Sequence, residues 1–150
     1  MDWNDEKKIL TEQLEILLAL REKFGQEVID LASQARLGVH QGWMKELSKQ
    51  DPPSRPSEVF SHSAYSVTTG GSDLLEYDVV EDSEKRFAVQ IRRCKYSDFY
   101  RKKGFPEIGY ALHCELDFGE AEVFWPGIRL KRTKTLMLGE DYCDHCYELP

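Results

Sequence analysis

The sequence predicts an α+β fold, in which N-terminal helices pack on an antiparallel β-sheet within a single domain. Apolar residues recur at helical spacing over residues 1–50 and alternate at strand spacing within residues 72–150. A chain of 150 residues also suits one hydrophobic core. Because the helices come first and most strands follow, the two kinds of element are segregated along the chain, as they are in α+β domains.

Two helices are expected at the N-terminus. Leucines at helical spacing give one apolar face to a helix over residues 3–22. A second helix is expected from about Gly25 into the forties. It contains Gly38 and Gly42, and because glycine weakens a helix, the pair suggests a close approach by another element. The alternative is that this helix ends near Leu37.

The middle of the chain reads as a loop followed by a hairpin. Prolines and serines over residues 51–57 interrupt the helical pattern, and a glycine pair at 70–71 marks a turn. Apolar residues then alternate with polar ones over 75–79 and again over 87–91. With an acidic turn at 81–84, these two runs predict an antiparallel hairpin.

Two short helices and two strands are expected in the C-terminal part. Residues 96–103 read as a short helix, and Pro106 opens another, which is expected to end at Gly119 in a left-handed conformation. Apolar residues over 128–138 share one face of a predicted strand. After a turn, residues 143–148 are expected to return beside it.

The charge and the cysteine content restrict the function classes. A net charge of −7 argues against nucleic acid as a partner, because an acidic surface repels phosphate backbones. The sequence has no apolar run long enough for a membrane span and no apolar signal core at its start, so we expect a cytoplasmic protein. In that compartment, the four cysteines are expected to be thiols. The charge does not choose between a monomer and a homodimer.

The predicted helix over residues 106–118 brings reactive side chains together. Cys114 and Asp117 are i, i+3 neighbours on one helical face, and Tyr110 lies four residues before Cys114 on that face. His113 lies four residues before Asp117. On a strand, Cys114 and Asp117 would point to opposite faces instead. The helix therefore predicts a reactive centre with a thiol, a carboxyl group, a phenol and an imidazole.

A second group of candidates lies on the last predicted strand. Cys143 and His145 share one face, and Asp144 and Cys146 share the other. The two cysteines have the spacing of a zinc knuckle, but a knuckle needs a turn where a strand separates the sulfurs. A site built from Cys114, Cys143 and a carboxylate, with or without a metal, is therefore favoured. If zinc is bound, the candidate ligands are Cys114, Cys143, His145 and Cys146.

Arg132 has two interpretations. It falls on the same strand face as the apolar residues of 128–138, so its guanidinium is expected to lie near the core. An arginine in that position can bind a substrate carboxylate through two parallel hydrogen bonds. The alternative is that Arg132 and Lys134 mark the exposed end of an edge strand.

Several motifs follow one another in the last part of the chain. They are CKYSDFY (94–100), GFPEIG (104–109), CELD (114–117), Pro126 with IRLKRTKTL (128–136), and Gly139 with Cys143-Asp144. In these motifs the chain resembles the L-2-amino-thiazoline-4-carboxylate hydrolase family. The match covers most of the chain and is specific over about the last 60 residues. A fainter similarity connects the chain with 4-vinyl-reductase-type ligand-binding domains.

The resemblance implies a hydrolase acting on a non-peptide C–N bond in a cyclic amidine, with an N-carbamoyl-cysteine as the product. It implies family-type positions at Cys94, Cys114, Asp117, Arg132, Thr133, Cys143 and Asp144. Thr133, Asp144 and Tyr110 join Arg132 as candidate substrate-binding residues. One position departs from the family pattern, because His145 stands where an aromatic such as Phe is usual.

Ring opening needs attack at an amidine-like carbon, a base for the nucleophile and an acid for the departing nitrogen. Cys114 is the candidate nucleophile, as a thiolate, with Asp117 or His113 moving the proton. A zinc ion held by Cys114 and Cys143 is a second route. The alternative function is a non-catalytic module that binds or senses a small molecule or zinc.

Overall fold

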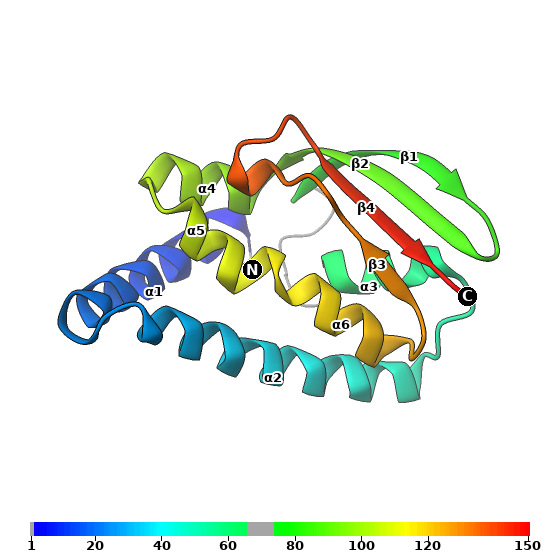
Figure 1. The fold of residues 1–150 in the computed structure, drawn as a ribbon, viewed down its shortest axis with the longest axis horizontal. Helices are drawn as coiled ribbons and strands as arrows, with labels where there is room; N and C mark the ends of the chain where they lie inside the picture. The colour runs from blue at the N-terminus through cyan, green and yellow to red at the C-terminus, as the bar shows by residue number, and fades with distance from the viewer. Residues whose placement is uncertain (1, 66–73) are drawn as a thin grey trace.

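The computed structural model describes residues 2–65 and 74–150, and it has the predicted α+β fold (Figure 1). The predicted turn at 70–71 lies outside the described residues. No helix of the described residues is long and apolar enough to cross a membrane. The elements are α1 (Trp3–Phe24), α2 (Glu27–Gln50), α3 (Pro56–Tyr65), β1 (Leu75–Asp82), β2 (Arg86–Cys94), α4 (Lys95–Lys103), α5 (Pro106–Gly109), the π-helical turn η2 (Tyr110–Cys114), α6 (Leu116–Phe124), β3 (Arg129–Lys131), the 3₁₀ turn η3 (Leu136–Leu138) and β4 (Cys143–Glu148).

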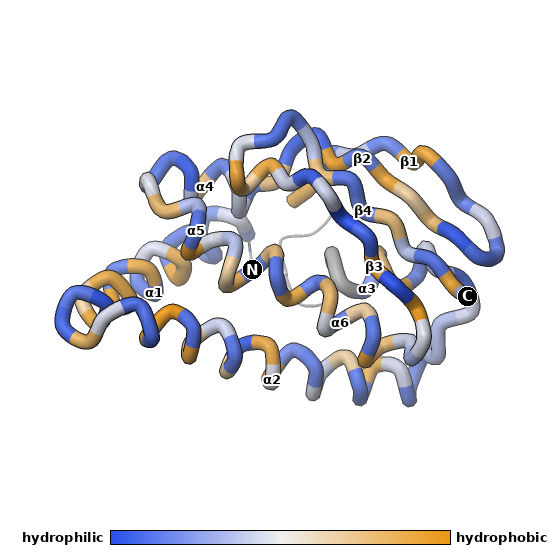
Figure 2. Tube along the Cα trace, in the orientation of Figure 1, coloured by the Kyte–Doolittle hydropathy of each residue, from blue (hydrophilic) through white to orange (hydrophobic). Residues whose placement is uncertain are grey.

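The two long helices form an N-terminal hairpin. The Asp2 side chain caps α1 by accepting the backbone N–H of Asp5 at 2.9 Å. Gly25 follows the helix with a φ of 89°, a conformation that favours glycine. Apolar and polar residues are interspersed along both helices, as expected for amphipathic helices (Figure 2).

α2 continues to Gln50, so the alternative end near Leu37 is wrong. Buried Met44 carries the apolar face of the helix beyond its two glycines. The close approach predicted at those glycines is also wrong, because a Cβ on either Gly38 or Gly42 would have no atom within 4 Å.

The tight contact occurs instead at Gly119 of α6, which lies between α2 and the sheet (Figure 1). A Cβ on Gly119 would lie 2.8 Å from Leu37 Cδ1. Gly119 is therefore an interior residue of a helix that continues to Phe124, and the predicted left-handed helix end at this position is wrong.

The sheet has four strands in the order β1-β2-β4-β3, and all three pairings are antiparallel. The predicted hairpin is confirmed, with Val79 opposite Val89. On the other side of β2, Val89 pairs with His145 of β4. Side chains from α2, α3 and α6 pack with the inward residues of β2 and β4 in one core cluster. The helices therefore cover one face of the sheet.

The predicted long strand over 128–138 is wrong, because β3 ends at Lys131 and Leu136–Leu138 form a 3₁₀ turn. Leu136 and Met137 are both buried, whereas Leu138 is exposed. Two consecutive buried side chains do not fit the alternation of a half-buried strand. The Thr135 hydroxyl caps this turn by accepting the backbone N–H of Met137.

Candidate functional site

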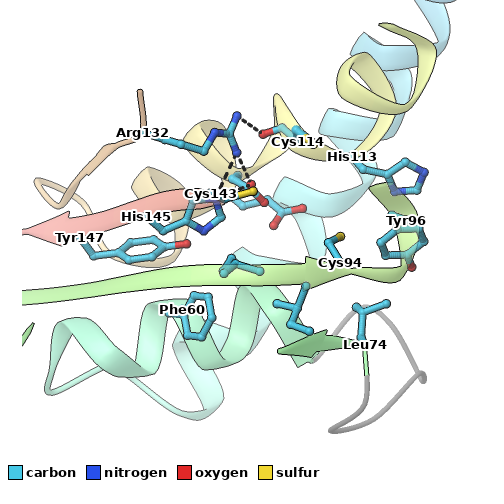
Figure 3. A pocket seen from close by; sticks show the side chains of 14 residues that line it. Phe60, Leu74, Cys94, Tyr96, His113, Cys114, Arg132, Cys143, His145 and Tyr147 are labelled. Carbon is cyan, nitrogen blue, oxygen red and sulfur yellow. Dashed lines mark hydrogen bonds and ion pairs between the residues drawn. The ribbon is translucent and has the colours of Figure 1, made fainter. Parts of the chain in front are cut away.

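A cavity of about 110 Å³ lies between the inner face of the sheet and the helical layer (Figure 3). Cavities on the order of 150 Å³ hold a molecule the size of benzene, so this one has the scale of a small molecule and excludes a polymer. Its wall is formed by Phe60, Leu74, Leu75, Ile91, Cys94, Tyr96, His113, Cys114, Asp117, Glu120, Arg132, Cys143, His145 and Tyr147.

Arg132 is the most connected polar residue of the cavity. Its Nη1 donates to Asp117 Oδ2 at 2.7 Å and to His145 Nε2 at 3.3 Å, and its Nη2 donates to the Cys114 carbonyl at 2.9 Å. The guanidinium carbon also lies 4.8 Å from the centre of the Phe118 ring. With a side chain only 3% exposed, Arg132 does not mark an exposed strand end, so that interpretation is wrong.

The pKa of the Asp117 carboxyl group lies near neutral pH. Burial raises the pKa of Asp117 to about 7, and the nearby Glu120 carboxyl adds to this effect. The Arg132 guanidinium acts in the opposite direction by favouring the carboxylate. A carboxyl group with a pKa near 7 exists in both forms at neutral pH, as a general acid–base group requires.

Burial keeps the thiols of the cavity protonated. It raises the pKa of Cys94 to about 12, and it also raises the pKa values of Cys114 and Cys143. Because the thiolate is the reactive form of cysteine, the resting site does not present Cys114 as an activated nucleophile.

Thr135 brings two of these thiols together. Its hydroxyl lies 3.9 Å from the sulfur of Cys114 and 3.9 Å from that of Cys143. The Cys143 sulfur also accepts the backbone N–H of Leu136 at 3.2 Å. Sequence reasoning missed Thr135, although a threonine directly before two buried residues is a signal for a helical cap.

The two histidines of the cavity are neutral and lie in different surroundings. Burial, reinforced by Arg132, lowers the pKa of His145 to about 3. Burial also lowers the pKa of His113, whose ring stacks on Tyr96 with centroids 4.3 Å apart. His113 Nε2 lies 3.1 Å from the Tyr100 hydroxyl, with which it forms a hydrogen bond. His113 and Arg132 lie apart in the cavity wall (Figure 3).

Three of the expected substrate-binding residues lie outside the cavity wall. Asp144 accepts the backbone N–H groups of Thr133 at 2.8 Å and Lys134 at 2.6 Å, and it also accepts the Thr133 hydroxyl. Asp144 and Thr133 thus fix the chain between Arg132 and Thr135. The Tyr110 ring lies 5.6 Å from the Arg132 guanidinium carbon and packs against the arginine.

The four candidate zinc ligands are not all brought together, because Cys146 lies on the opposite face of β4 from Cys143 and His145. β4 alternates as expected, with Cys143 and His145 buried on the inner face and Cys146 on the other. The Cys146 sulfur accepts the Nε–H of Arg86 at 3.1 Å on that outer side. Within residues 2–65 and 74–150, no group of three or more His, Cys, Asp or Glu side chains is arranged to hold a metal ion. The geometry therefore does not support a zinc site.

A second buried polar pair was missed from the sequence. His40 Nδ1 lies 2.5 Å from Glu120 Oε1, and it joins α2 to α6. Glu120 follows Asp117 by three residues and also lines the cavity. Extending the predicted helix past Gly119 would have placed both carboxyl groups on one face.

Comparison with known proteins identifies the family. The family model for L-2-amino-thiazoline-4-carboxylic acid hydrolase matches residues 6–147. No curated protein matches the chain. Two of the solved structures that match the chain share its fold at TM-scores above 0.5.

The first is a trafficking protein particle complex subunit 3 from Naegleria fowleri, covalently bound to palmitic acid. It has a TM-score of 0.55 and 11% identity, over 98% of this chain and 96% of that chain. The second is the phenol-responsive sensory domain of the transcription activator PoxR with phenol, with a TM-score of 0.53 and 12% identity, over 90% of this chain and 71% of that chain. Identities this low show the fold alone. Because the family model spans nearly all of the sequence, the chain belongs to the L-2-amino-thiazoline-4-carboxylic acid hydrolase family.

Proposed function

We propose that this protein is a hydrolase that opens a small cyclic amidine, such as a 2-aminothiazoline ring that carries a carboxylate. One observation carries the proposal: a carboxyl group with a pKa of about 7, that of Asp117, lies beside Arg132 in a cavity the size of a small ring. Membership of the family supports the same reaction class.

In the proposed reaction, Asp117 moves protons and water is the nucleophile. The Asp117 carboxylate accepts a proton from water while the water oxygen bonds to the amidine carbon. The electron pair of the C=N bond goes to the ring nitrogen, which then receives that proton from Asp117. Proton transfer of this kind contributes about 100- to 10,000-fold to a rate.

The second step opens the ring. Asp117 takes the proton of the new hydroxyl group as the C=O bond forms, and the C–S bond breaks with its electron pair on sulfur. Asp117 then gives the proton to sulfur. An N-carbamoyl-cysteine keeps both nitrogens on the former amidine carbon, so the departing atom is sulfur and not the nitrogen expected from the sequence.

Water is preferred to Cys114 as the nucleophile for an energetic reason. Burial raises the pKa of the Cys114 thiol far above that of Asp117, so forming its thiolate inside the cavity is unfavourable. Cys114 and Cys143, each with its sulfur 3.9 Å from the Thr135 hydroxyl, then form part of the wall against which the ring lies.

The alternative candidate is a non-catalytic domain that binds or senses a small molecule. Its support is the chemistry of the wall, where the thiols and both histidines are neutral and most other side chains are apolar or aromatic. The PoxR sensory domain, which has the same fold, was solved with phenol.

Turnover of L-2-aminothiazoline-4-carboxylate tests the proposal. Asp117→Asn is expected to lower kcat by about 100-fold or more, because the amide cannot accept the proton of water. The wild-type rate is expected to rise with pH through about 7, since the carboxylate is the basic form. Liquid chromatography of the ring-opened product measures both effects.

Matched variants separate the alternatives. Cys146→Ser, on the outer face of β4, is expected to keep wild-type turnover. Cys114→Ser is expected to keep most of it if water attacks and to lose it if the thiol does. Full activity of Asp117→Asn would refute the proton-transfer role. A wild-type protein that binds the ring tightly without opening it would favour the sensory alternative.

A further inference from the structure

The inner face of β4 carries a buried donor that lacks a partner. The His145 side chain is only 9% exposed, and its Nδ1 has no hydrogen-bond partner among the described residues. Buried polar atoms are nearly always hydrogen-bonded, because an unpaired one loses its contact with water without compensation. Since His145 lines the cavity, its unpaired nitrogen indicates the position of a ligand atom.

The neighbours of His145 determine which ring nitrogen holds the proton. Arg132 Nη1 lies 3.3 Å from Nε2, and a guanidinium can only donate, so Nε2 accepts. Among the described residues, the other polar neighbour of Nε2 is Asp117 Oδ2 at 3.7 Å, which is too distant to accept a hydrogen bond. The proton of the neutral ring is therefore on Nδ1, and this atom requires an acceptor.

Arg132 is poorly placed to receive a ligand carboxylate. Its Nη1 donates hydrogen bonds to Asp117 and His145, and its Nη2 donates one to the Cys114 carbonyl. Two parallel hydrogen bonds from Nη1 and Nη2 to a carboxylate would compete with these contacts. The guanidinium instead polarises the imidazole from its Nε2 side, which makes the Nδ1–H group a stronger donor to an anion.

Aromatic rings surround this donor. Phe60 and Tyr147 each lie 6.3 Å from the His145 ring in edge-to-face geometry. The Tyr147 hydroxyl is directed toward the centre of the cavity in Figure 3. A flat ring can lie against these aromatic walls while one of its substituents reaches His145.

We propose that the Nδ1–H group of His145 binds the carboxylate oxygen of a small planar ring, and that Arg132 positions His145 without touching the ligand. The inference rests on the proposed function for the identity of the ring. It reassigns the carboxylate contact from Arg132 to His145 and makes His145 the residue that selects carboxylate-bearing rings.

Two substitutions at His145 test the inference. His145→Gln keeps an amide near the position of Nε2, where it can still meet Arg132, but it removes the Nδ1 donor. His145→Asn keeps an amide donor near the position of Nδ1. The substrates are L-2-aminothiazoline-4-carboxylate and 2-aminothiazoline, which lacks the carboxylate. If the wild-type protein opens neither ring, dissociation constants from calorimetry replace kcat/KM.

His145→Gln is expected to lower kcat/KM for the carboxylate-bearing ring by about 10- to 100-fold, the value of one hydrogen bond to a charged group. For the ring without carboxylate, the expected change is less than about threefold. His145→Asn is expected to recover part of the loss. Thermal melting curves establish that both variants are folded, and Cys146→Ser serves as the β4 control.

The outcomes separate this inference from the proposed function. Equal losses for both rings, or an unchanged preference in His145→Gln, would overturn the carboxylate contact while leaving hydrolysis intact. Carboxylate-selective binding without ring opening would support the contact and refute the hydrolase. Absence of binding to either ring would overturn the proposed ligand class. In ¹⁵N spectra of the wild-type histidines, a proton on Nε2 of His145 would also refute the assignment.

Discussion

Asp117 and Asp144 hold the same short segment from opposite sides, with different consequences. Asp117 reaches Arg132 from inside the cavity through a charged pair at 2.7 Å. Asp144 holds Thr133 and Lys134 from the outer face of β4 through their backbone N–H groups. The Asp117 carboxyl group therefore lies beside a buried guanidinium and thiols, whereas the Asp144 carboxyl group contacts backbone amides and a hydroxyl.

The surroundings shift the pKa values of the two carboxyl groups in opposite directions. Burial raises the pKa of Asp117 to about 7 despite its guanidinium partner. Partial burial acts in the same direction on Asp144, but its hydrogen bonds from Thr133 and Lys134 outweigh it and lower the pKa. The inner aspartate is thus suited to exchange a proton, whereas the outer one stays ionised as an anchor.

Replacing Arg132, which pairs with Asp117 inside the cavity, is expected to have the largest effect on stability. Arg132→Met leaves Asp117 without its guanidinium, and breaking a buried pair destabilises a protein by about 3–5 kcal/mol. The loss is expected to be greater at pH 8 than at pH 5, because protonated Asp117 needs no partner. Urea unfolding at both pH values measures it. Exposed Arg129→Met is the matched control, and equal stability of the two variants would contradict the assignment.

Replacing Asp144, which holds the segment from the outer face of β4, is expected to have an intermediate effect on stability. Asp144→Ala deprives two backbone N–H groups and one hydroxyl of their acceptor, at a cost of about 1–3 kcal/mol. Turnover should fall by only a few-fold, since Asp144 does not line the cavity. Urea unfolding beside Asp141→Ala, an exposed aspartate, measures the difference. If both variants unfold at the same urea concentration, Asp144 does not anchor the segment.

The pH dependence of stability is expected to distinguish the two carboxyl groups most directly. The raised pKa of Asp117 favours folding below about pH 4, and this contribution is lost as pH rises through about 7, with a slope of at most about 1.4 kcal/mol per pH unit. The lowered pKa of Asp144 contributes stability above about pH 4 that is lost as pH falls through its folded value. Unfolding of Asp117→Asn and Asp144→Asn across pH 3–8 should remove these two slopes separately. Identical pH profiles of the two variants would refute the contrast.

Local periodicity was sufficient for most of the fold. The α1–α2 hairpin, the β1–β2 hairpin and the return strand β4 follow from spacings of apolar residues that lie close in sequence. The errors arise where a tertiary contact overrides a local rule. Gly119 looked like a helix end because the close packing of Leu37 and Gln41 from the distant α2 against it has no local signal in the sequence.

The site was predictable to the extent that it depends on one helix and one strand. The spacing of Cys114 and Asp117, and the alternation along β4, place several candidates in one cavity. The partners that come from far away had no local signal. His40 lies 80 residues from Glu120, so their hydrogen-bond contact could not be inferred from periodicity.

The π-helical turn at Tyr110–Cys114 constrains how this sequence can change in length. Its hydrogen bond runs from the Glu115 N–H group to the Tyr110 carbonyl at 3.0 Å and accommodates one more residue than an α-helical turn. Because the extra residue is absorbed within this turn, deleting one residue here would convert it into an ordinary α-helical turn. The deletion would shift His113 and Cys114 relative to the cavity, while Asp117 and the rest of α6 would keep their register. We therefore expect homologues that lack one residue in this turn to keep the fold around the cavity but not the positions of its reactive side chains.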